Sequence, residues 1–332
     1  MSEFDHDVLG IGNAIVDILS RCDDTFLEAQ NLPKGHMQLI DAAEVDRLYS
    51  VMGPATEISG GSAANTIAGL ASFGARSAFI GKVSDDQFGR IFSHDIRSIG
   101  VTYENEPAAN SKPTARCLVL VTPDGERTMN TYLGSSVELG EEELRPNLVK
   151  NSQILYLEGY LYDPPEAQRA FHRAAEMAKE AGARVALSLS DSFCVDRHRE
   201  AFISFIRSGV DVLFANEEEI KSLFQTDSFE EATRMTTESC DLAALTLGAA
   251  GSVIATPGTR TEVAAEPVER VVDTTGAGDL YAAGFLFGLS RNFDLETCAR
   301  LASLAAAEII SHIGARPETS LAKLARARNY MS

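Results

Sequence analysis

The residues best placed to carry out chemistry together lie in segment 273–279, which reads Asp-Thr-Thr-Gly-Ala-Gly-Asp. Its two glycines, Gly276 and Gly278, allow a tight turn and a close ligand approach, because neither carries a Cβ. The apolar run 280–289 that follows predicts a buried helix. Gly276, Ala277 and Gly278 would then lie at a helix N-terminus, where free N–H groups and the helix dipole bind anions. Such a site can stabilise the charge on a phosphoryl group in transfer.

Asp279 would lie in the first turn of this helix, where two roles are open to it. An acidic side chain there complements the helix dipole, which is worth about 0.3–1 kcal/mol. Alternatively, Asp279 could be a general base that takes the proton from an attacking hydroxyl. The flanking glycines and the second carboxylate, Asp273, favour the general base. Spacing argues against two other nucleotide sites, since the chain has no G-x-x-x-x-G-K-S/T loop and the 276–278 glycines do not continue to G-x-G-x-x-G.

The overall charge limits the classes of partner. The chain has 29 Lys and Arg against 48 Asp and Glu, a net charge of −19, without a basic run, which argues against a nucleic-acid partner. A polyphosphate must therefore be bound locally, by backbone N–H groups, Mg²⁺ and a few basic side chains. No stretch approaches the roughly 18 apolar residues that span a bilayer, so we expect no membrane partner. The five cysteines are scattered and odd in number, so we expect a reducing, cytoplasmic compartment.

Alternating strands and helices predict the scaffold that positions these residues. We expect strands at 8–12, 77–80, 154–157, 185–189, 212–215, 242–247 and 252–255, with a strand end at 271–272. We expect helices at 63–73, 85–99, 165–181, 199–208, 216–224, 275–289, 295–312 and 321–330. This order predicts an α/β fold with a mostly parallel sheet between helices.

Two stretches interrupt this alternation. The strand-like segments 115–121 and 127–133 flank Asp124-Gly125, a turn signal that predicts a β-hairpin. The region 14–40 is rich in turn residues and only weakly helical. Together they predict a small β subdomain attached to the α/β core.

The chain resembles the PfkB (ribokinase-like) carbohydrate and nucleoside kinase family, most closely its adenosine-kinase branch. Segment 273–279, followed by Ala282-Ala283-Gly284-Phe285, is similar to the family's C-terminal signature. Its N-terminal signature is matched in order and spacing by Gly60-Gly61-Ser62-Ala63-Ala64-Asn65, Gly74, Gly81-Lys82-Val83, Asp85-Asp86 and Gly89. The resemblance covers about residues 8–318 and implies one ribokinase-like α/β/α domain over 1–332. It also implies a small β lid formed from about 14–48 and 103–134.

The resemblance implies an ATP-dependent kinase and assigns donor-side roles. Asp279 matches the catalytic base, and Gly276, Ala277 and Gly278 match the anion hole. Asn216 and Glu219 match residues that position Mg²⁺ and the phosphates through water, with Glu219 nearest the metal. Without the family, Asn216 is better explained as a helix N-cap followed by acidic residues. The other implied ATP-binding residues are Thr246, Gly248, Gly251, Thr274 and His312, and the small-residue helix that ends near His312 is equally well explained as a plain buried helix.

On the acceptor side, Gly12-Asn13 followed by Asp17 resembles the family's first substrate loop. A carboxylate accepts two hydrogen bonds from vicinal hydroxyls, so Asp17 suits a ribose 2′,3′-diol. Asn13, Gly60, Gly61 and Asn65 are implied as further sugar contacts. Arg127 matches a lid arginine that reaches the transferring phosphate, although a solvated hairpin arginine is an equal alternative.

The resemblance favours transfer of the ATP γ-phosphoryl group to the 5′-hydroxyl of a nucleoside, with adenosine first. A free sugar such as ribose or a ketohexose remains open as the acceptor. A non-catalytic nucleotide sensor on the same fold is disfavoured, because Asp279 and both glycines are present. An NAD-dependent dehydrogenase would need a third glycine after Gly10 and Gly12. A monovalent cation is possible, and both a monomer and a homodimer are compatible with the sequence.

Overall fold

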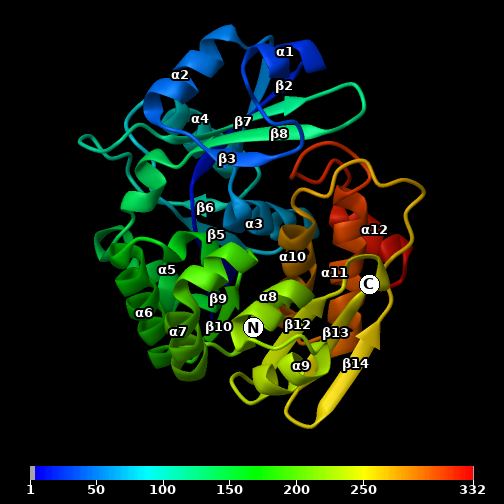
Figure 1. The fold of residues 1–332 in the computed structure, drawn as a ribbon. Helices are drawn as coiled ribbons and strands as arrows, with labels where there is room; N and C mark the ends of the chain where they lie inside the picture. Colours follow the sequence, from blue (N-terminus) through cyan, green and yellow to red (C-terminus); the bar gives the residue numbers. More distant parts are fainter. Residues whose placement is uncertain (1–3, 332) are drawn as a thin grey trace.

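A nine-stranded sheet forms the centre of the computed structural model, which describes residues 4–331 (Figure 1). Its strand order is β14-β13-β12-β11-β10-β9-β1-β5-β6. All neighbours are parallel except the pairs that β13 makes with β12 and β14. The strands are β1 (His6–Ile11), β5 (Ser77–Ile80), β6 (Thr102–Tyr103), β9 (Ser152–Glu158), β10 (Arg184–Ser188), β11 (Val212–Asn216), β12 (Leu242–Thr246), β13 (Ser252–Thr256) and β14 (Thr259–Val263).

Helices cover both faces of this sheet, because its strands are apolar on both sides. In β1, Val8 belongs to the core on one face and Leu9 to the core on the other. The first face carries α3 (Ser62–Phe73), α4 (Gln87–Ser98), α10 (Ala277–Ser290), α11 (Leu295–Ile309) and α12 (Leu321–Ala327). The second carries α5 (Pro146–Lys150), α6 (Pro165–Glu180), α7 (Ser192–Gly209), α8 (Glu217–Phe224) and α9 (Phe229–Thr237). The predicted three-layer α/β fold is confirmed.

A second sheet, of order β3-β8-β7-β2-β4, lies above the edge where the parallel strands of the first sheet end (Figure 1). Its strands are β2 (Ile15–Arg21), β3 (Met37–Leu39), β4 (Ala55–Gly60), β7 (Ala115–Val121) and β8 (Arg127–Tyr132). The predicted hairpin is confirmed as the antiparallel pair β7–β8. Helices α1 (Asp24–Ala29) and α2 (Ala42–Val51) cover the outer face, and the opposite face carries a small apolar cluster around Val119.

Several predicted elements differ from those observed. The strand β4 and the edge strand β14 are missing from the prediction, because neither sequence shows a regular apolar alternation; β14 is also exposed over most of its length. Helix α9 was also missed, although Ser228 caps it by accepting from Glu231 N. The predicted strand end at 271–272 lies outside any strand. Within 4–331, no helix is long and apolar enough to cross a membrane.

Close contact between α10 and α11 fixes the start of α10, which segment 273–279 enters. A Cβ on Gly284 would lie 2.4 Å from Leu301 O and 2.6 Å from Ala302 Cα. A Cβ on Gly288 would lie 2.7 Å from Cys298 Sγ. The two glycines therefore bring the helix backbones together at a distance that no larger residue allows.

We predict that Gly284→Ala lowers the free energy of unfolding by about 1–3 kcal/mol, because the added methyl group collides with backbone atoms that cannot yield. Gly140→Ala is the control, since a Cβ there meets no atom closer than 3.8 Å and its φ is −135°. The control should change stability by less than about 0.5 kcal/mol. Urea unfolding followed by circular dichroism measures both, and equal values would contradict the close helix contact.

Candidate active site

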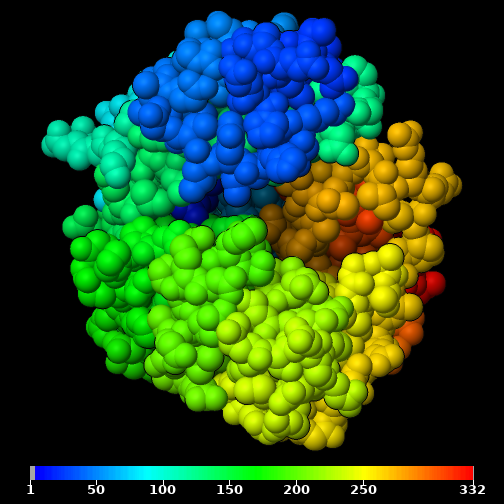
Figure 2. Space-filling model, in the orientation of Figure 1, coloured from blue at the N-terminus to red at the C-terminus, as the bar shows by residue number. Residues whose placement is uncertain are grey.

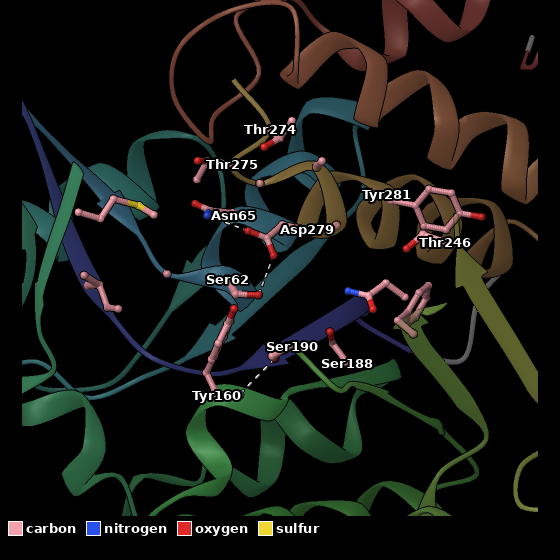
Figure 3. Close-up of a pocket in the computed structure, with 18 of the residues that line it drawn as sticks. Ser62, Asn65, Tyr160, Ser188, Ser190, Thr246, Thr274, Thr275, Asp279 and Tyr281 are labelled. Atoms are coloured by element: carbon pink, nitrogen blue, oxygen red, sulfur yellow. Dashed lines mark hydrogen bonds between the residues drawn. The ribbon is translucent and has the colours of Figure 1, made fainter. Parts of the chain in front are cut away.

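A cavity of 480 Å³ opens between the two sheets at the carboxyl ends of the parallel strands (Figures 2 and 3). Ser188, Asn216 and Thr246 are the last residues of β10, β11 and β12, and all three line it. Loops and helix N-termini converge at this edge in an α/β sheet, which makes it the usual place for a ligand. Of the predicted site residues, the cavity wall contains Asp17, Gly61, Asn65, Arg127, Asn216, Glu219, Thr246, Thr274, Gly276, Ala277, Gly278 and Asp279.

The predicted anion loop forms the start of α10. Gly276 is the N-cap residue with φ 78°, a left-handed conformation that favours glycine, and a Cβ there would lie 3.0 Å from Ala315 Cβ. The Ala277 N–H donates to Thr274 O at 3.2 Å, which closes the turn before the helix. Gly278 is exposed and has open space where a Cβ would stand, so a ligand can approach its backbone directly.

Asp279 projects from the first turn of α10 into the cavity, where α3 holds its carboxylate (Figure 3). Oδ1 accepts a hydrogen bond from Ser62 Oγ at 2.6 Å, and Oδ2 accepts one from Asn65 Nδ2 at 3.0 Å. Burial raises the pKa of Asp279, while the two hydrogen bonds and the positive charge of Arg316 oppose the increase. A fixed carboxylate with a raised pKa beside an anion site can accept a proton from a hydroxyl.

Asp17 lies on β2 and faces the same cavity. Burial raises its pKa to about 6, with the charges of Arg316 and Arg127 lowering it and that of Asp279 raising it. Its carboxylate lies against the backbone of Gly60, where a Cβ would come within 2.3 Å of Oδ2. The glycine at position 60 is therefore required by contact with the carboxylate, although Gly60 does not line the cavity itself.

Asn13 does not reach the cavity as the sequence predicted. Its Nδ2 donates to Glu158 Oε1 at 2.6 Å, and its backbone N–H donates to the same oxygen at 3.2 Å. The other oxygen of Glu158 accepts from Ala63 N at 2.7 Å. Burial raises the pKa of Glu158 to about 7 despite these three bonds. Sequence analysis missed Glu158, the last residue of β9, and its position after an apolar strand was the available signal.

A second cavity of 690 Å³ adjoins the first. Its walls are mostly apolar and include Gly248, Gly251 and Val268. Both cavities are lined by five shared residues, namely Thr246, Thr274, Ala277, Gly278 and Tyr281. The anion loop therefore lies at the junction of two compartments, an arrangement that suits transfer of an anionic group between two ligands.

Asn216 and Glu219 form a capping box at the start of α8. Asn216 Oδ1 accepts from Glu219 N at 2.9 Å, and Glu219 Oε2 accepts from Asn216 N at 2.9 Å. Burial raises the pKa of Glu219 to about 7. The helix-cap interpretation made from the residues alone is confirmed, and both side chains also line the first cavity.

Arg127 and His312 have partners that the sequence did not indicate. Arg127, on β8, lines the first cavity, and its guanidinium forms a buried ion pair with Asp273. Asp273 also accepts from Thr275 N at 2.9 Å and from Gly314 N at 3.0 Å. The ring of His312 lies 3.3 Å from a Glu308 oxygen and outside the wall of both cavities.

Tyr160, Ser188, Ser190 and Phe214 also line the first cavity, and sequence analysis did not select them (Figure 3). Ser190 has φ 71°, and its Oγ accepts from Tyr160 N at 3.1 Å. Left-handed non-glycine residues are uncommon and concentrate at functional sites. Ser188 ends β10 and Phe214 lies within β11, while Tyr160 and Ser190 lie two residues after β9 and β10, so nearness to the carboxyl ends of these strands was the signal in the sequence.

The known proteins to which this chain is similar include both sugar kinases and adenosine kinases. The model described as pfkB family carbohydrate kinase matches residues 46–321. The crystal structure of a probable sugar kinase from Rhizobium etli CFN 42 is 49% identical with a TM-score of 0.91, covering 99% of this chain and 100% of that one. An adenosine kinase from Sinorhizobium meliloti is 53% identical with a TM-score of 0.90, covering 97% and 99%. An ATP-dependent ribose-1-phosphate kinase from Halopiger xanaduensis is 30% identical over 290 residues, 86% of this chain and 93% of the relative.

We predict that Asp17→Asn stabilises the protein at about pH 8 and has little effect at about pH 4. The folded-state pKa of about 6 lies above the ordinary value of 3.8. The folded state therefore holds a proton that the unfolded state releases, and stability falls as the pH rises through this window. Removing the titrating group should raise the free energy of unfolding at about pH 8 by on the order of 1 kcal/mol.

Asp294→Asn is the control with the opposite sign. Hydrogen bonds from Thr297 to this exposed N-cap of α11 lower the pKa of Asp294, so its ionised form stabilises the fold above the ordinary pKa. Its replacement should lower stability slightly at about pH 8 and leave it unchanged at low pH. Urea unfolding at both pH values tests the pair, and equal destabilisation by Asp17→Asn at both would contradict the raised pKa.

Proposed function

Since this chain belongs to the PfkB family of carbohydrate kinases, and is a phosphotransferase with an alcohol group as acceptor, we propose that the alcohol is the 5′-hydroxyl of a nucleoside, adenosine first. The observation that carries the proposal is the apolar face of the second sheet above the first cavity. Ile15, Cys117, Val119 and Met129 line this cavity from β2, β7 and β8. A nucleobase covers such a surface, whereas a free sugar places hydroxyl groups against it without hydrogen-bond partners.

The ribose would lie between the base and the anion loop. Asp17 would accept hydrogen bonds from the 2′- and 3′-hydroxyls, which requires its ionised form. Asn65 and the backbone at Gly60 and Gly61 would complete the sugar contacts. Asn13 would act at one remove, by fixing the loop before β2 through its bonds to Glu158.

The donor would be ATP, the phosphate donor of the kinase family. Its adenine would occupy the apolar second cavity beside Gly248 and Gly251, and its phosphates would extend past Thr246 and Thr274 to the junction of the two cavities. The γ-phosphoryl group would then already lie at the anion loop, next to the acceptor in the first cavity, when transfer begins. The role assigned to His312 gains no support, because its ring pairs with Glu308 instead of lining this cavity.

Asp279 would remove the proton from the 5′-hydroxyl as the oxygen attacks the γ-phosphorus. The N–H groups of the anion loop, at Gly276, Ala277 and Gly278, would stabilise the charge on the transferring group. Arg127 lies close enough to line the same cavity and would add a positive charge if it exchanged Asp273 for a phosphate oxygen. The second sheet would form the lid that excludes water, which would otherwise hydrolyse ATP.

Mg²⁺ is typical of this kinase family and would neutralise phosphate charge when bound. In residues 4–331, no group of three or more His, Cys, Asp or Glu side chains could hold a metal ion. The chain therefore fits a Mg²⁺ ion that is held mainly by phosphates and water, the usual arrangement at nucleotide sites. Glu219, with Asn216, would bind its water ligands from the cavity wall.

We predict that Mg-ATP phosphorylates adenosine with a kcat/KM about 100-fold above that for ribose, since covering on the order of 100 Å² of apolar surface contributes about 2.5 kcal/mol. A coupled assay of ADP release measures turnover with adenosine, guanosine, inosine, ribose and fructose. The control is 5′-deoxyadenosine, which should compete with adenosine and should not be phosphorylated. Turnover with free sugars alone would overturn the nucleoside assignment and leave the kinase activity in place.

We predict that Asp279→Asn lowers kcat by about 10³-fold, the usual contribution of a general base, and leaves the affinity for ATP within about twofold. Calorimetric titration with ATP measures the affinity, and the coupled assay measures kcat. Asp294→Asn, in the next helix and remote from the cavities, is the matched control and should keep wild-type kcat. Retention of more than about a tenth of the activity by Asp279→Asn would show that Asp279 is not the base.

A further inference from the structure

The three-residue segment 314–316, which follows α11, contacts two parts of the site. One is the start of α10, and the other is the junction between β4 and α3. Gly314 N donates to the Asp273 carboxylate at 3.0 Å, at the start of the anion loop. Ala315 packs so closely on Gly276 that a Cβ there would lie 3.0 Å from Ala315 Cβ. The segment therefore supports the anion loop from behind.

Arg316 extends from the same segment to the junction between β4 and α3. Its Nε donates to Ser59 O at 2.9 Å, its Nη2 to Ser59 Oγ at 2.9 Å, and its Nη1 to Ala64 O at 2.6 Å. Ser59 and Ala64 bracket residues 60–63, and Ser62 in this stretch holds Asp279. The planar guanidinium group thus binds the end of β4 and the start of α3 at once, which a single ammonium group cannot do.

Ser59 is fully buried and is held from a second side by α4. Its N–H and Oγ donate to Asp95 Oδ2 at 2.8 and 2.6 Å. The Ser59 hydroxyl therefore donates to a carboxylate and accepts from a guanidinium, so both of its hydrogen-bonding functions are used. The end of β4 is fixed at this residue between α4 and the segment after α11.

We propose that Arg316 is a positioning residue for the acceptor side of the reaction: it fixes the junction between β4 and α3, residues 59–64, and places a positive charge near the carboxylates of Asp17 and Asp279. The proposal rests on the proposed kinase function, and it holds for a nucleoside or a sugar acceptor. In the described part of the chain, the hydrogen bonds of Arg316 all go to carbonyl or hydroxyl oxygens of Ser59 and Ala64. Its charge is therefore available to the carboxylates through space.

The charged groups around these carboxylates are few. Asp17 faces Arg316, Arg127 and Asp279, and Arg127 is already paired with Asp273. Among the charges that lower the pKa of Asp17 against the effect of burial, that of Arg316 has the largest effect. Burial lowers the pKa of Arg316 to about 10, with Asp17, Asp95 and Asp279 opposing the decrease, so the guanidinium remains charged at neutral pH.

Loss of this charge should raise the pKa of Asp17 above 6, and activity should then fall at a higher pH on acidification. For Arg316→Gln, we expect the acidic limb of kcat/KM for the acceptor to move up by about one pH unit. KM for the acceptor should rise about tenfold, and KM for ATP should change less than about twofold. Arg316→Lys keeps the charge and loses the double contact, so its acidic limb should stay in place while KM for the acceptor rises.

Arg291→Gln is the matched control. Arg291 forms an ion pair at 2.9 Å with the buried carboxylate of Asp7, remote from both cavities. Its loss should reduce stability without moving the acidic limb or either KM. An unmoved limb in Arg316→Gln, or an equal rise in both KM values, would overturn the proposal and reduce Arg316 to a structural residue. If Arg316→Gln does not fold, Arg316→Lys decides: an unchanged acceptor KM would also overturn it.

A measurement without turnover separates this inference from the proposed function. Asp17→Asn should stabilise the Arg316→Gln protein more than it stabilises the wild type at about pH 8, because Asp17 is then buried without its opposing charge. Urea unfolding of the four proteins in this cycle gives the coupling, and additive effects would contradict the proposal. A wild-type enzyme that phosphorylates no acceptor would instead overturn the proposed function, whatever the cycle shows.

Discussion

Burial of carboxylates around one cleft is the constraint on which the rest of the site depends. Burial raises the pKa of Asp17 to about 6 and those of Glu158 and Glu219 to about 7, and it raises the pKa of Asp279 as well. Under the proposed function, a chain of net charge −19 would bring a polyphosphate to this place and would have to limit the repulsion. Backbone N–H groups at helix starts would do this, because they bind anions and carry no counter-charge to be desolvated.

A buried carboxylate also holds the loop before β2 in place. Glu158 accepts N–H bonds from Asn13 and Ala63, so one buried carboxylate joins the loop before β2 to the start of α3. Helix α3 then presents Ser62 and Asn65 to Asp279. The position of Asp279 is therefore set by a continuous set of hydrogen bonds from β9 through α3 to α10.

Local sequence predicted the parts of the site that are local in structure. The start of α10 and the cap formed by Asn216 and Glu219 follow from spacing within seven residues or fewer, and both are present. Arg316 binds Ser59 across 257 positions, and Asn13 binds Glu158 across 145, so no periodicity or motif connects them. The fold was predictable because buried parallel strands are apolar on both faces. The missed strands β4 and β14 lack that signal, since β4 is buried only at its last two residues and β14 only at its last one.

Asp273 shows why the second sheet and the anion loop behave as one unit. Its carboxylate accepts hydrogen bonds from Thr275 N, in the same loop, and from Gly314 N, in the segment after α11. It also forms an ion pair with the guanidinium of Arg127 on β8. Two of these partners are backbone groups of the core, and the third belongs to the second sheet. The ion pair between Arg127 and Asp273 therefore joins the second sheet directly to the start of segment 273–279. Under the proposed function, the sheet that would cover the acceptor is for this reason tied to the segment that would bind the phosphate.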